Sequence, residues 1–92
     1  MDHFYKDILR FQIDVKQCID DRNSPIARKL TDEVQRLEDA VQVKKNPNSI
    51  EDIVKRVQSI LEEAGHHEVM SHNDVHSLEH RCEHFVQELR KM

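Results

Sequence analysis

Apolar residues recur at intervals of three and four along four stretches of the chain, and short polar segments separate these stretches. This spacing keeps apolar side chains on one face of an α-helix, so the pattern predicts four amphipathic helices. We expect them over residues 3–22, 25–44, 49–64 and 72–91. The predicted core-facing residues are Phe4, Ile8, Phe11, Val15 and Cys18 in the first helix, Ile26, Leu30, Val34, Leu37 and Val41 in the second, Ile50, Ile53, Val54, Val57, Ile60, Leu61 and Ala64 in the third, and Val75, Leu78, Cys82, Phe85, Leu89 and Met92 in the fourth.

Polar residues at two of the expected helix starts support these boundaries. Ser24 precedes Pro25, and such a pair suits a helix that is capped by a hydroxyl and has proline in its first turn. Ser71 is followed three residues later by Asp74, which is the spacing of a capping motif. Both pairs therefore predict where a helix begins.

The third helix is expected to begin at a cap formed by Asn48 or Ser49. It is expected to end at Gly65, which is the only glycine of the chain. Glycine readily adopts the left-handed conformation that ends many helices. The sequence therefore predicts a left-handed residue at position 65.

The connections between the predicted helices are short, so consecutive helices are expected to lie antiparallel. The simplest fold that buries all four apolar faces is an all-α, antiparallel four-helix bundle of up-down-up-down topology, formed by a single domain over residues 1–92. A chain of this length buries only a modest core. The alternative is therefore a pair of helical hairpins completed by dimerisation.

The charge balance argues against nucleic acid and membranes as partners. The chain has 14 Lys and Arg against 18 Asp and Glu, a formal net charge of −4, whereas phosphate binding relies on clustered basic residues. No apolar stretch approaches the length that spans a bilayer, and the first residues lack the pattern of a signal peptide. We therefore expect a cytoplasmic protein in which Cys18 and Cys82 are free thiols within the core.

The residue types do not favour catalysis. With 1 glycine, the chain lacks a glycine-rich phosphate loop and has few exposed backbone N–H groups with which to build an oxyanion hole. Both cysteines fall on core-facing rows, and the Glu-x-x-His pattern of metal-dependent catalytic bundles is not reproduced. We expect no enzymatic activity, no catalytic residues and no required cofactor.

The first predicted helix carries more apolar surface than one core can cover. Tyr5, Leu9 and Ile13 form a second apolar row, spaced four residues apart and turned away from the core-facing row. Scattered apolar residues on a surface need no function. Regular spacing, however, is typical of a helix that docks on another protein. We therefore expect Tyr5, Leu9 and Ile13 at a protein interface, most simply that of a homodimer.

Four of the 7 histidines repeat every four residues along the last predicted helix, on the face opposite the core. Imidazoles one turn apart can share a metal ion with nearby carboxylates, and zinc or a similar divalent metal suits such donors. We call His72, His76, His80 and His84 the histidine ladder. The candidate metal ligands are His76, His80, His84, Glu79 and Glu83.

The histidine ladder has two other interpretations. It can be a solvated polar face without a role, or a pH-responsive surface, because clustered imidazoles gain positive charge together on acidification. Successive ladder residues also wind around the helix by about 40° per step, so no more than two neighbours can bind one ion.

The sequence as a whole predicts a small acidic helical protein that is not an enzyme. We expect it to act through protein–protein contacts, as an adaptor, a regulator or an immunity-type module, and to self-associate. The alternative function is a metal- or pH-responsive binding module that uses the histidine ladder.

Overall fold

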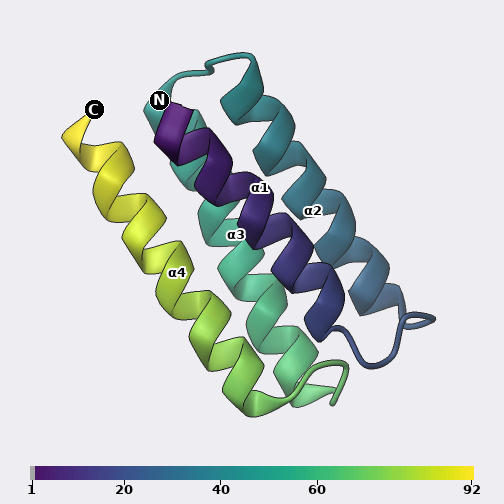
Figure 1. Ribbon diagram of the computed structural model, residues 1–92. Coiled ribbons are helices and arrows are strands. Elements are labelled where there is room, and N and C mark those ends of the chain that lie inside the picture. The colour runs from purple at the N-terminus through teal and green to yellow at the C-terminus, as the bar shows by residue number, and fades with distance from the viewer. Residues whose placement is uncertain (1) are drawn as a thin grey trace.

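The computed structural model describes residues 2–92, and these residues form four α-helices and no strand (Figure 1). The helices are α1 (Asp2–Cys18), α2 (Pro25–Gln42), α3 (Pro47–His66) and α4 (His72–Lys91). The prediction of an all-helical chain with four helices is therefore confirmed. The predicted bounds of the fourth helix agree with those of α4, whereas the other three helices differ from the predictions at one or both ends.

The first predicted helix extends too far. α1 ends at Cys18 rather than at residue 22, because the chain turns there to meet the α3–α4 connection. The backbone N–H groups of Asp20 and Asp21 donate to the carbonyl oxygen of Val69, at 2.8 and 3.4 Å. These bonds satisfy backbone groups that a longer helix would have paired within itself. α2 likewise ends two residues early, at Gln42, and Lys44 then adopts a left-handed conformation with φ 58°.

The caps of α2 and α4 are those that the sequence predicts. The Ser24 hydroxyl accepts from the backbone N–H of Ile26, and the Ser71 hydroxyl accepts from the backbone N–H of Asp74. The predicted cap of the third helix is wrong. The side chain of Asn46 caps α3 and accepts from Asn48, so that Pro47 opens the helix in the first turn.

The predicted role of Gly65 is also wrong. Gly65 lies buried inside α3, which continues to His66, and the left-handed residue of this turn is Glu68, with φ 56°. A Cβ atom at Gly65 would lie 3.3 Å from Cγ2 of Val75 on α4. The missing side chain at Gly65 therefore serves close packing between α3 and α4 rather than helix termination.

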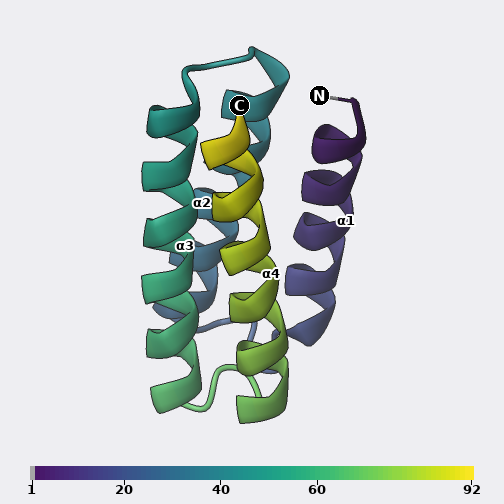
Figure 2. The ribbon, with the colours of Figure 1, turned by 90° about the vertical axis from the view of Figure 1, so that its left-hand side faces the viewer.

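The helices pack as a bundle in which each helix has two neighbours. α1 packs against α2 and α4, and α3 packs against the same two helices. Figure 2 shows α1 and α3 on opposite sides of the bundle, with α2 and α4 between them. Both chain termini and the α2–α3 connection lie at one end, and the other two connections lie at the opposite end (Figure 1). The bundle measures 35 × 20 × 19 Å.

All four helices of the chain contribute to one core. Of the predicted core-facing residues, Cys18 and Ile26 are only partly buried, Met92 is exposed, and the others are buried. The core also takes residues from the two connections that meet at the same end, where Ile19, Val69 and Met70 are buried. The apolar faces of α1 to α4 are thus covered within a single chain.

Polar contacts between side chains join each pair of neighbouring helices. One of them, between Gln12 and Gln35, involves a largely buried amide, and another ends on the largely buried carboxylate of Glu33. Such satisfied polar contacts favour one arrangement of the helices over its alternatives. They are Gln12 to Gln35 at 2.8 Å between α1 and α2, Arg56 to Glu33 at 3.1 Å between α3 and α2, Arg90 to Glu51 at 3.2 Å between α4 and α3, and Arg81 to Asp14 at 2.6 Å between α4 and α1.

Candidate functional site

The apolar row Tyr5, Leu9 and Ile13 is exposed to different degrees along α1. The Tyr5 hydroxyl donates to Glu38 on α2 at 3.4 Å, and partial burial together with that carboxylate raises the pKa of Tyr5. Leu9 is half-buried, whereas Ile13 is 55% exposed. Tyr5 therefore contacts α2, and Leu9 and Ile13 form the outward apolar surface of α1.

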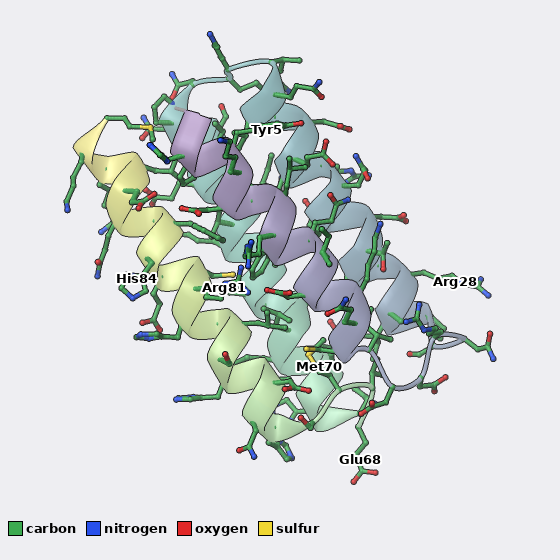
Figure 3. The ribbon with its side chains drawn as sticks, in the orientation of Figure 1. Tyr5, Arg28, Glu68, Met70, Arg81 and His84 are labelled. Atoms are coloured by element: carbon green, nitrogen blue, oxygen red, sulfur yellow. The ribbon has the colours of Figure 1, made fainter. Side chains whose placement is uncertain are left out.

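The histidine ladder is exposed along α4, as its spacing predicts. Two of its members form a pair: Nε2 of His84 lies 3.3 Å from Nε2 of His80, and the two rings meet edge to face with centroids 4.8 Å apart. Nδ1 of His80 is 3.9 Å from a carboxylate oxygen of Glu83. Figure 3 shows His84 pointing away from the bundle. This pair therefore faces solvent.

The predicted metal ligands separate into two groups. Within the described residues, no three His, Cys, Asp or Glu side chains are already arranged to hold one metal ion. His80, Glu83 and His84 lie together on the outer surface of α4. His76 and Glu79 instead line a groove of about 260 Å³ between α3 and α4. The five candidate ligands are thus divided between the outer face of α4 and this groove.

The groove lies where α3 ends and α4 begins, next to the α3–α4 connection. We call it the His/Glu groove; its lining residues are Glu62, Gly65, His66, His72, Val75, His76 and Glu79. Partial burial of Glu79 raises the pKa of its carboxyl, and the nearby carboxyl of Glu62 raises it further. Two carboxyl groups and three imidazoles thus line one groove.

The four-residue spacing of the ladder does not indicate that Glu62 lies beside it, although the sequence holds a signal for this. In two antiparallel helices, residues that are equally far from the connection lie opposite each other. Residue 69 is the midpoint of the α3–α4 connection, so this rule pairs His66 with His72 and Glu62 with His76. The length of the α3–α4 connection therefore predicts which residues of α3 lie opposite the histidine ladder, which the four-residue spacing of the ladder alone does not.

A second groove, of about 400 Å³, lies between the end of α1 and the beginning of α2. We call it the basic groove, because Lys16, Arg22 and Arg28 contribute positive charge to it and Asp32 is its only acidic residue. Figure 3 shows Arg28 extending outward from the start of α2. Its apolar floor is formed by Ile19 and Ala27. The spacing of apolar and charged residues does not indicate this groove, since its residues come from a connection and two helix ends.

Neither cysteine has the environment of a catalytic nucleophile. Cys82 is buried in the core, and burial raises the pKa of its thiol to about 12. Partial burial also raises the pKa of Cys18, and the carboxylate of Asp74 adds to this shift. A thiol must ionise to act as a nucleophile, so neither thiol is expected to react as a nucleophile at neutral pH.

Comparison of the chain with protein families, with curated proteins and with solved structures found no significant match. In the part of the chain that the structure describes, none of the helices combines the length and the apolar character needed to cross a membrane.

Proposed function

We propose that this protein is a non-enzymatic cytoplasmic module that acts through protein–protein contacts and pairs with a second copy of itself. In this proposal each copy is an up-down-up-down bundle, and the apolar row of α1 forms the interface. The observation that carries the proposal is that Ile13 is 55% exposed, with Leu9 one turn away only half-buried. Large apolar side chains in a row on a regular helix favour docking onto another apolar surface.

The charges beside the row also suit a second copy. Lys6 and Arg10 each follow a residue of the row by one position and are exposed, so they flank it on one side. Glu38 lies on the other side, where it accepts from Tyr5, and the exposed Asp39 follows it in α2. Opposite charges on the two flanks of one apolar row can pair across a two-fold interface.

The proposal is tested by replacing Leu9 and Ile13 together with Lys and measuring molar mass by light scattering. The wild type is expected to be a dimer, and the variant a monomer with an unchanged helical circular dichroism spectrum. A matched control is Val43→Lys, because Val43 is 65% exposed at the end of α2 and away from the row. A variant that stays dimeric, or a control that dissociates equally, would show that the interface lies elsewhere.

A second candidate function is a pH-responsive surface on α4, and the contact between His80 and His84 favours it. At 3.3 Å between ring nitrogens, one ring must donate and the other accept, so both cannot be protonated without repulsion. Acidification is then expected to separate the two rings and add positive charge beside Glu83. NMR contacts between the two rings should be present in the wild type at neutral pH and absent in acid. If the contacts persist unchanged in acid, this candidate is wrong.

A further inference from the structure

The His/Glu groove brings two side-chain pairs from different helices face to face. Glu62 and His66 are four residues apart on α3, and His72 and His76 are four residues apart on α4. Residues at this spacing lie on one face of a helix, about 5–6 Å apart at Cβ. The two faces meet beside Gly65, where the absence of a side chain lets α3 and α4 approach closely. A ring nitrogen of His72 would lie 3.7 Å from a Cβ at that position.

The groove contains two carboxyl groups and no Lys or Arg side chain. Glu62 and Glu79 both line it, together with three imidazoles. By contrast, two other carboxylates of α3 contact basic side chains: Glu63 contacts Lys29 at 3.3 Å, and Glu51 contacts both Lys55 and Arg90. A cation placed in the groove would therefore meet carboxylates that no Lys or Arg of the lining neutralises.

We propose that the His/Glu groove binds one divalent transition-metal ion of the zinc class. Mixed imidazole and carboxylate donors select such ions over Mg²⁺ and Ca²⁺, which prefer oxygen ligands alone. Within the described residues these donors are not arranged around one point without an ion. Most of them are exposed and Glu79 is half-buried, so binding requires their side chains to rotate toward a common ion. The donors available are Glu62, His66, His72, His76 and Glu79.

This assignment differs from a metal site on the outer face of α4. His80, Glu83 and His84 belong to one helix and face solvent, so they offer an ion ligands from one side only. The groove offers ligands from two helices, which are joined by a connection of five residues. Zinc usually takes four ligands, and a two-helix groove approaches that number more closely than a single helix face. The proposal is also independent of self-association through α1.

The test compares two double variants in binding Zn²⁺ by calorimetry and Co²⁺ by visible absorption. Glu62→Gln/His76→Ala removes one groove donor from each helix. His80→Ala/His84→Ala is the matched control, because it removes two imidazoles from the outer face of α4. All four side chains are exposed, so both variants should keep the helical content and melting temperature of the wild type.

The wild type is expected to bind one ion per chain, and excess Mg²⁺ should not displace it. The groove variant should bind at least about tenfold more weakly, and the control should bind within about twofold of the wild type. Equal loss in both variants, or loss in the control alone, would overturn the assignment in favour of the outer face. A wild-type protein that binds neither Zn²⁺ nor Co²⁺ would overturn it altogether.

Discussion

Helix α4 packs against its two neighbours in different ways. Against α3, the contact is close and depends on a missing side chain, because Gly65 leaves room for Val75. Against α1, the contact is built from large rings, since Phe4 and Phe11 meet Phe85 edge to face at centroid distances of 5.7 and 5.3 Å. We call the α3–α4 interface the close seam and the α1–α4 interface the ring-based seam. The close seam should be destabilised by adding a side chain at Gly65, and the ring-based seam by removing an aromatic ring.

The polar contacts at the two seams differ as well. Arg81 reaches from α4 to Asp14 on α1 at 2.6 Å, and its guanidinium lies 5.3 Å from the ring centroid of Phe11 (Figure 3). At the interface between α3 and α4, Arg90 contacts Glu51 near the end of α4, whereas Gly65 meets Val75 near the beginning of α4. The side chain of Arg90 in this contact is exposed. The ring-based seam thus combines apolar and ionic contacts at one place, whereas the close seam separates them.

The largest effect is expected at the seam between α1 and α4. Phe11 is fully buried, so Phe11→Ala should lower the free energy of unfolding by about 3–5 kcal/mol, because it removes ring contacts and leaves a cavity. Urea denaturation followed by circular dichroism measures this loss. Val43→Ala at the exposed end of α2, outside the proposed interface, is the control and should change stability by at most about 0.5 kcal/mol. Equal losses would mean that the rings do not form the main contact.

A smaller effect, with a change of sign, is expected at the seam between α3 and α4. Gly65→Ala should destabilise the wild type by about 1 kcal/mol, because the crowding of Val75, which is stiff at χ1, outweighs the gain in helix propensity. In a Val75→Ala background the same change should stabilise by about 1 kcal/mol, since only the propensity gain remains. Stabilisation in both backgrounds would show that Gly65 is not needed for close packing.

The smallest effect is expected at the exposed contact of that seam. The guanidinium of Arg90, together with Lys55, lowers the pKa of Glu51 below its ordinary value of 4.5. A carboxyl whose pKa is lower in the folded state stabilises the fold above the unfolded pKa, and the gain disappears as pH falls through the folded pKa. Glu51→Gln should therefore slightly lower the melting temperature at pH 7, and the difference should shrink as pH falls below 4.5 and vanish once Glu51 is protonated in the folded state. A difference that persists unchanged there would exclude the ion pair as its cause.

Much of the helical pattern could be predicted because it depends on local spacing. The core-facing rows, the Ser24 and Ser71 caps and the limits of α4 all follow from residues close together in the chain. Two of the errors arose where distant segments meet. α1 ends early because its following residues bond to Val69, and Gly65 is placed by Val75 rather than by a helix end.

The candidate sites follow the same division. Exposure of the histidine ladder could be read from its position opposite the core-facing row of α4. The spacing of residues within one helix does not indicate the His/Glu groove or the basic groove, because each joins residues of two helices across a connection. The degree to which Tyr5, Leu9 and Ile13 are covered also depends on the neighbouring helix, since Tyr5 contacts Glu38. The periodicity of apolar residues predicts which face of a helix is buried, but the residues that its other face contacts depend on how the neighbouring helices pack.

A native mass spectrum of the untagged wild-type protein shows whether two copies of the chain pair. The proposal predicts that the main species has twice the mass of one chain, and that Leu9→Lys/Ile13→Lys reduces it to the mass of one chain. A wild-type protein that has the mass of one chain across its soluble concentration range would contradict the proposal.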